Sequence, residues 1–155
     1  MGRYVIKGEA VQTTIGWILL VLGGSLYIAQ VISSIDFKLA QRLGIQENPE
    51  ETDSLLQTAE RYTAYWDLVT LGWLPLAGLL MIIDHDWWAI VALIGGAIYL
   101  DTSGREAAKN ISFRREGIKI GTEKQQKVFF VSYIVMAIIG VALIAYSVGE
   151  LVSRL

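Results

Sequence analysis

Four long stretches of this sequence are almost free of charged side chains: residues 15–34, 64–83, 87–100 and 128–149. The chain has 13 Lys and Arg and 15 Asp and Glu residues, yet Asp67 is the only one of them inside these stretches. A helix on the surface of a soluble bundle carries charged residues along the face that contacts water. Helices without such a face are expected to contact lipid instead. The sequence therefore predicts an integral membrane protein.

The predicted fold is all-α, a single domain in which four transmembrane helices form an antiparallel, up-down bundle. About 20 residues of helix cross a bilayer core about 30 Å thick, and we expect spans at residues 13–35, 62–83, 86–106 and 128–149. The third apolar stretch is too short to cross alone, so its helix must continue into the polar run 101–106. Pro75 removes one backbone hydrogen bond inside the second span, which predicts a kink near Leu71 and Gly72.

The connections between the spans are predicted from turn and capping residues. Residues 36–44 are expected to continue as a helix that ends at Gly44. Asn48 and Pro49 are typical of a helix start, and this helix is expected to run unbroken into the second span. Residues 84–86 form a tight turn between the second and third spans. The pattern of residues 111–121 suggests a small β-hairpin that turns at Glu116 and Gly117.

The distribution of basic residues predicts the orientation in the membrane. The loops 36–61 and 107–127 lie on one side of a four-span chain and carry most of the Lys and Arg residues, whereas Arg3, Lys7 and Arg154 lie on the other side. Because basic loops stay in the cytosol, we predict cytosolic loops, non-cytosolic termini and a location in the plasma or inner membrane. A basic start followed by an apolar run also begins a signal peptide, but the run is long and predicts a retained first span.

Polar side chains gather in the cytosolic halves of the predicted spans. Asp67 is an ionisable residue inside a span, which is costly and marks a candidate functional site. Asp101 and Arg105 are one helical turn apart, and the short third span draws them toward the membrane. We predict that these three residues form a polar node, with these neighbours: Gln30, Ser34, Thr63, Thr70 and Tyr99. The alternative is that the polar groups only hold the helices together by hydrogen bonds.

Two further groups of charged residues are candidates for other contacts. The third loop is basic, and four of its residues are expected either to contact anionic lipid or only to set the topology: Lys109, Arg114, Arg115 and Lys119. Asp84, His85 and Asp86 are metal-ligating residue types. Adjacent residues in a tight turn seldom point at one centre, however, so we predict no metal site.

The sequence contains no motif for phosphate, dinucleotide or catalytic-metal binding, no Cys and a single His. We therefore predict no cofactor and favour a protein that is not an enzyme. The formal net charge of −2 gives no reason to expect a nucleic-acid partner. The expected partners are membrane lipids and, as possibilities, further copies of the chain or a larger membrane complex.

The leading functional prediction is a non-catalytic membrane protein, either an accessory subunit or a lipid- or small-molecule-binding module with a polar pocket in the cytosolic leaflet. The alternative is an oligomeric small transporter or channel in which Asp67 couples ions or protons. A third possibility is a membrane enzyme that acts on a lipid or isoprenoid, with Asp67 or Asp101 as general acid or base.

Overall fold

The computed structural model describes residues 2–155, with side chains described from Glu9 onward. The described chain is helical over most of its length and contains no strand, only an isolated bridge between Thr52 and Ile120. Three helical segments are long and apolar enough to cross a membrane: Glu9–Ile35, Ser54–Ile82 and Glu123–Ser153. The all-α prediction is confirmed. The side chains of Arg3 and Lys7, used above to predict the orientation, lie outside the described residues.

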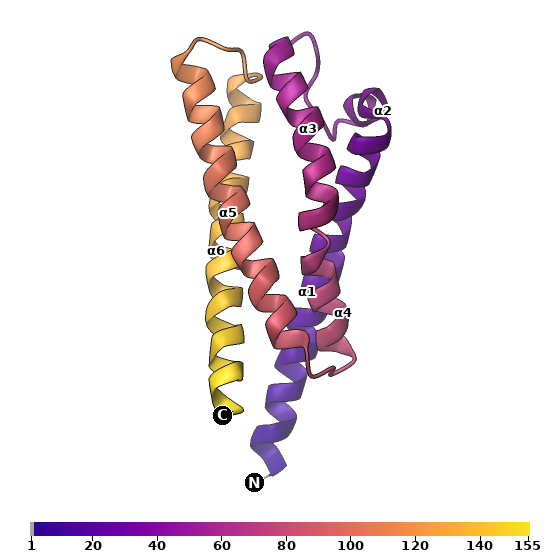
Figure 1. Ribbon diagram of the computed structural model, residues 1–155, viewed down its shortest axis with the longest axis vertical. Coiled ribbons are helices and arrows are strands. Elements are labelled where there is room, and N and C mark those ends of the chain that lie inside the picture. The colour runs from indigo at the N-terminus through magenta and orange to yellow at the C-terminus, as the bar shows by residue number, and fades with distance from the viewer. Residues whose placement is uncertain (1) are drawn as a thin grey trace.

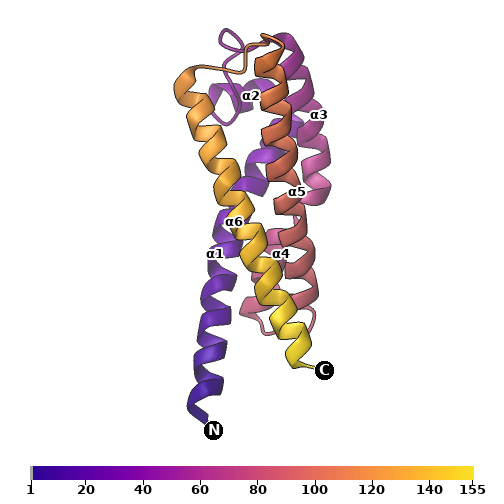
Figure 2. The ribbon, with the colours of Figure 1, turned by 90° about the vertical axis from the view of Figure 1, so that its left-hand side faces the viewer.

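Six helices follow one another along the chain: α1 (Gly2–Ile35), α2 (Phe37–Arg42), α3 (Ser54–Thr70), α4 (Trp73–Ile82), α5 (Trp88–Arg115) and α6 (Glu123–Ser153). Figures 1 and 2 show α1, the α3–α4 pair, α5 and α6 extending along the long axis of the molecule. Both termini lie at one end, and α2 lies at the opposite end with the loops 43–53 and 116–122. We call the end that holds α2 the loop end.

The interruption of the second apolar segment lies where the sequence predicts it. Helix α3 ends at Thr70 and α4 begins at Trp73, so Leu71 and Gly72 separate them. Pro75 has no N–H to donate, and its ring would clash with the carbonyl of Leu71, four residues earlier, in a regular helix. The helical hydrogen bonds resume beyond the proline, where the N–H of Leu76 donates to the carbonyl of Gly72 at 3.2 Å.

The start of α3 differs from the prediction. The helix does not begin at Asn48; it begins at Ser54, and the Asp53 side chain accepts a hydrogen bond from the N–H of Leu55 at 2.9 Å. The reason lies in the partner loop: the N–H of Asp53 donates to the carbonyl of Lys119, next to the Thr52–Ile120 bridge. This pairing holds the chain extended up to Asp53, so Asp53 becomes the N-cap.

The third apolar stretch continues as a helix through the polar run 101–106, as predicted, and α5 extends further to Arg115. The hairpin predicted for residues 111–121 is therefore wrong. Residues 111–115 of this pattern form the last turns of α5, and the chain leaves the helix at Gly117, which has a φ of +73°. Glycine is the usual residue at such a C-terminus, and Arg114 and Arg115 in the last turn complement the helix dipole.

Packing differs between the two ends of the molecule. Near the termini, α4 packs between α1 and α5 around a core that includes Leu74, Met81 and Trp88, and α5 also packs closely against α6. Toward the loop end, α5 is connected to α3 mainly through ion pairs between long side chains. The helices therefore enclose a tight apolar core at one end and a charged interior at the other.

Candidate functional site

The structure brings together the three charged residues of the predicted polar node. One Arg105 nitrogen lies 3.9 Å from a carboxylate oxygen of Asp67, and another lies 3.9 Å from a carboxylate oxygen of Asp101. The Asp67 side chain is only 5% exposed, whereas that of Asp101 is 73% exposed. These separations allow attraction between the charges but are too long for hydrogen bonds. The node is therefore an ion-pair cluster with a buried acid on α3 and an accessible acid on α5.

A second ion cluster lies one to two helical turns closer to the loop end. The ammonium of Lys109 donates to a carboxylate oxygen of Glu60 at 2.7 Å and also pairs with Glu106, one turn earlier on α5. All three side chains are less than 20% exposed. Lys109, expected to contact anionic lipid, thus has its charge neutralised inside the protein. Glu60 and Glu106 were not predicted for the site, although Glu60 precedes Asp67 by two helical turns and shares its face of α3.

Two other elements contribute polar groups beside these clusters. From α5, the side-chain amide of Asn110 donates to the Tyr133 hydroxyl of α6 at 2.6 Å. From the loop after α2, the carboxyl group of Glu47 lies in the field of Glu60, Lys109 and Glu106. Burial and the negative charge of Glu60 raise the pKa of Glu47 to about 7, while the nearby Lys109 opposes this shift. The charged interior is thus built from α3, α5, α6 and this loop.

The remaining residues predicted for the node form no hydrogen bond to its charged members. The hydroxyl of Ser34 donates to the carbonyl of Val31, and that of Thr70 to the carbonyl of Trp66, each within its own helix. Tyr99 is buried in the apolar core, and Thr63 is half-buried. The side-chain oxygen of Gln30 is buried and has no hydrogen-bond partner within the described chain.

A shallow hollow of about 300 Å³ opens beside the node between α3 and α5. It joins three predicted residues, because Thr70, Asp101 and Arg105 all line it. Its other lining residues are Trp66, Ala97, Ile98 and Thr102. The polar node is therefore reachable from this side of the molecule.

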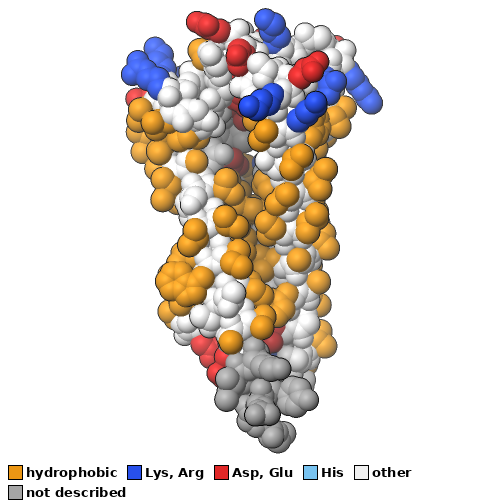
Figure 3. All heavy atoms as spheres, turned by 180° about the vertical axis from the view of Figure 1, so that it is seen from behind, with side chains coloured by type: hydrophobic (Ala, Val, Ile, Leu, Met, Phe, Trp, Pro, Cys, Tyr) orange, Lys and Arg blue, Asp and Glu red, His pale blue; other side chains and the backbone are white. Residues whose placement is uncertain are grey.

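A deeper apolar cavity lies between α1 and α6, and we call it the α1–α6 groove. Its volume is about 420 Å³, and it is lined by Ile18, Leu19, Leu22, Ser25, Leu26, Leu74, Tyr99, Val131, Ser132, Val135, Met136 and Ile139. Figure 3 shows the molecule hollowed between two columns of apolar side chains, with an acidic side chain visible inside the hollow toward the loop end. The groove is open along its length because α1 and α6 do not pack closely against each other.

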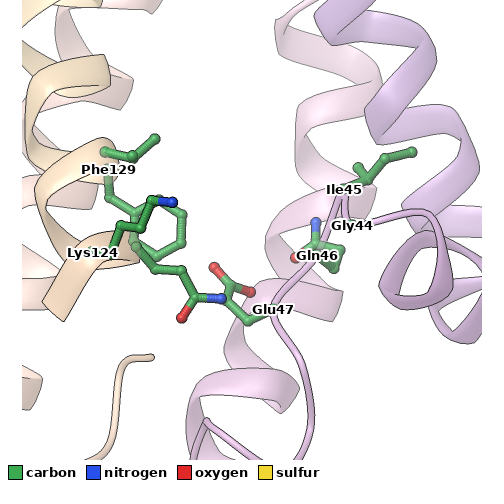
Figure 4. Close-up of a pocket in the computed structure, with 8 residues that line it drawn as sticks. Gly44, Ile45, Gln46, Glu47, Lys124 and Phe129 are labelled. Carbon is green, nitrogen blue, oxygen red and sulfur yellow. The ribbon is translucent and has the colours of Figure 1, made fainter. Parts of the chain in front are cut away.

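A third cavity, of about 360 Å³, continues along the same face of α6 toward the loop end, and we call it the head pocket. One wall is formed by the loop residues Gly44, Ile45, Gln46 and Glu47, and the other by Lys124, Gln125, Val128 and Phe129 of α6. Figure 4 shows the Glu47 side chain extending from the loop toward α6. On α6 the lining passes from Val128 of the head pocket to Ser132 of the groove, one helical turn apart.

In the turn between α4 and α5, the side chains of Asp84 and His85 form hydrogen bonds with different partners. The ring nitrogen Nδ1 of His85 accepts a hydrogen bond from the N–H of Trp87 at 3.2 Å, and the Asp84 carboxylate accepts one from the Gln12 amide at 3.0 Å. Among the residues that the structure describes, no group of three or more His, Asp or Glu side chains is arranged to hold a metal ion.

Of the other basic residues predicted to contact anionic lipid, Arg114, Arg115 and Lys119 are exposed at the loop end. Arg114 lines a separate hollow beside the first half of α6. Lipid contact by these three residues stays a prediction.

Comparison of the chain with protein-family models, with curated proteins and with solved structures finds no match. The arrangement itself combines two features that an amphiphilic molecule needs. The α1–α6 groove offers apolar surface, and the neighbouring clusters and head pocket offer charged and hydrogen-bonding groups.

Proposed function

We propose that the chain is an integral membrane protein that crosses the bilayer four times and binds a lipid or another small amphiphile in the α1–α6 groove. Support for membrane insertion comes from the three long apolar segments and from large apolar side chains that are exposed on them, such as Trp17, Val69 and Ile138. Figure 3 shows apolar side chains along the middle of the molecule and Lys and Arg gathered at the loop end. Soluble monomeric proteins rarely expose so much contiguous apolar surface to water, so this surface is expected to contact lipid.

Helix α5 is the proposed fourth span, and α1, α3–α4, α5 and α6 then form the antiparallel, up-down bundle. Its apolar first half lies beside α4, and its charged second half faces Asp67 and Glu60 of α3. Charged groups inside a membrane protein are normally paired with one another. The ion pairs on α5 therefore support a span whose polar residues face inward. The basic residues gathered at the loop end support a cytosolic location of that end.

The observation that carries the binding proposal is the α1–α6 groove and the position of the head pocket next to it on the same face of α6. Ligand sites in proteins are mostly apolar hollows of about 300–1,000 Å³ with a few polar groups. The groove has this size and lining, and only Ser25, Ser132 and the Tyr99 phenol interrupt its apolar wall. An amphiphile would place its chain in the groove and its polar group toward the loop end.

Native mass spectrometry of the protein released from detergent tests this proposal. Val135→Trp should fill the groove and reduce the fraction of protein that retains a bound lipid by about tenfold, an effect of about 1.4 kcal/mol. Ile138→Trp is the matched control, because Ile138 is exposed on the same helix and does not line the groove. Equal lipid retention in wild type and Val135→Trp would contradict the proposal.

A second candidate function is proton-coupled transport through Asp67. The observation in its favour is that one carboxylate oxygen of Asp67 is buried and has no hydrogen-bond partner in the described chain. Such an acid could take up and release a proton during a transport cycle. In that case Asp67→Asn should abolish a proton-driven flux into liposomes, whereas a pure binding module shows no such flux.

A further inference from the structure

The charged interior contains more acids than bases. Four carboxyl groups, those of Glu47, Glu60, Asp67 and Glu106, are buried or half-buried at the loop end. Only Lys109 and Arg105 among the groups paired with them carry positive charge. Four acids against two bases leave an excess of carboxyl groups, and this excess carries negative charge where the acids are ionised, as Glu47 is at pH values above its pKa of about 7. Charge buried in a protein is costly unless it is compensated, so this interior favours the arrival of a further cation.

Asp67 is one acid whose charge is incompletely compensated. Its side chain is 5% exposed, and its Oδ1 atom has no hydrogen-bond partner among the described residues. The one cation beside it, Arg105, stays 3.9 Å away and is shared with Asp101 and Glu106. Buried carboxylates normally accept several hydrogen bonds. Asp67 can therefore accept a bond or an ion contact from another positively charged group.

Glu47 is a second acid whose charge is incompletely compensated. No ion pair joins it to another residue in the described part of the chain, and Lys124 on the opposite wall of the head pocket does not pair with it. Lys109, whose positive charge acts to lower the pKa of this acid, is already bonded to Glu60 and Glu106. The two incompletely compensated acids thus belong to α3 and to the loop that lines the head pocket.

Neither acid lines the α1–α6 groove, but residues that line it lie next to the acid-rich interior. The neutral phenol of Tyr99 lines the groove and lies close enough to Asp67 to be affected by the charge of that carboxylate. On α6, Ser132 lines the groove, and the next residue, Tyr133, accepts a hydrogen bond from Asn110 beside the ion clusters. A molecule in the groove therefore has the acid-rich interior at the end of its apolar path.

We propose that the ligand of the α1–α6 groove is a lipophilic cation, a molecule that places apolar groups in the groove and its positive charge toward the acid-rich interior to which Asp67 and Glu47 belong. This inference rests on the proposed function, because it names the ligand class of the same groove. A monatomic metal ion suits the interior less well, because no three acid or histidine side chains among the described residues converge on one point. An anionic amphiphile would be repelled by the excess of carboxylates.

The test uses two probes of the same shape and opposite charge, tetraphenylphosphonium and tetraphenylborate. Their binding to the full-length protein in lipid nanodiscs is measured by isothermal titration calorimetry, with empty nanodiscs subtracted. We expect saturable binding of tetraphenylphosphonium and at least tenfold weaker binding of tetraphenylborate, as the excess of negative charge requires.

Two variants remove the acids in turn. Measured at pH 8, above the pKa of about 7 of Glu47, Asp67→Asn and Glu47→Gln should each weaken tetraphenylphosphonium binding by about tenfold, because each removes a charge that attracts the probe. Glu116→Gln is the matched control, since Glu116 is an exposed acid at the same end that forms no ion pair among the described residues. Circular dichroism verifies that each variant is folded, and Glu47→Gln, in a loop, keeps the test valid if Asp67→Asn unfolds.

The outcomes separate this inference from the proposed function. Equal binding of both probes, or wild-type affinity in both acid variants, would overturn the lipophilic-cation proposal. Loss of retained lipid in Val135→Trp would then still support amphiphile binding in the groove. Absence of probe binding together with no effect of Val135→Trp would overturn both.

Discussion

Glu47 is the single residue whose ionisation should have the clearest effect on stability. It faces Glu60 of α3, Lys109 and Glu106 of α5, and the wall of α6 that carries Lys124. Burial and the charge of Glu60 raise its pKa from an ordinary value of 4.5 to about 7. The folded protein therefore holds this proton at pH values where the unfolded chain has lost it, and stability contributed by the protonated acid is lost as pH rises from about 4.5 to about 7.

We accordingly predict that the melting temperature in detergent falls between pH 5 and pH 8, and that Glu47→Gln reduces the fall. The full effect of the shift is up to about 3 kcal/mol. Glu50→Gln, an exposed acid three residues away, should leave the pH dependence unchanged. Parallel pH profiles for wild type and Glu47→Gln would show that Glu47 ionises normally.

At the scale of single residues, the sequence predicts part of the charged interior. The cluster of Asp67, Asp101 and Arg105 follows from two facts that a sequence contains: an acid inside an apolar stretch and a third stretch too short to cross a bilayer. The pairing of Lys109 with Glu60 does not follow, because Glu60 lies just outside an apolar stretch and could equally face water. Which of two charged residues faces a neighbouring helix depends on the rotation of both helices, and that is decided by packing.

At the scale of elements, local signals are reliable where no other segment competes with them. Pro75 interrupts its helix at Leu71 and Gly72, since the missing N–H and the ring clash act within the helix itself. Asn48 and Pro49 carry an equally clear start signal, yet α3 begins at Ser54. There the backbone of the 116–122 loop pairs with residues 52 and 53, a long-range contact that capping preferences do not contain.

Close helix crossings are a further feature of the elements, and glycines make them possible. A Cβ atom on Gly78 of α4 would lie 2.6 Å from the carbonyl oxygen of Gly16 in α1. A similar crossing joins Gly96 of α5 to Gly140 of α6, where an added Cβ would lie 3.0 Å from the opposite carbonyl oxygen. Small residues of this kind let membrane helices approach closely.

We predict that Gly78→Ala destabilises the protein by about 1–3 kcal/mol, because α1 and α4 must separate to accommodate the methyl group. Gly24→Ala is the control: an added Cβ on Gly24 meets no atom within 4 Å, and alanine favours the helix by up to about 1 kcal/mol. Thermal unfolding in detergent, followed by circular dichroism, should place Gly78→Ala below wild type and Gly24→Ala at or above it. A Gly78→Ala variant as stable as wild type would show that the crossing is looser than the structure indicates.

For the whole molecule, the difference between its two ends connects structure to the proposed function. At the end with the termini, α4 packs tightly between α1 and α5. At the loop end, ion pairs connect α5 to α3, and the head pocket and the α1–α6 groove stay open beside them. A binding module needs both properties, because a rigid base positions the groove and an open end admits the ligand.

The orientation of the molecule in the membrane is the last prediction. Both termini lie at one end and the basic loop end lies at the other, and basic loops are retained in the cytosol. The chain contains no Cys, so single cysteines can report each side without a background signal. Arg115→Cys, after α5, should react with a membrane-impermeant maleimide only once cells are opened. Asp86→Cys, in the turn before α5, should react on intact cells. The wild-type protein, which has no Cys, is the control for non-specific labelling. The reverse pattern would place the charged interior, with Asp67 and Glu47, on the outer side of the membrane.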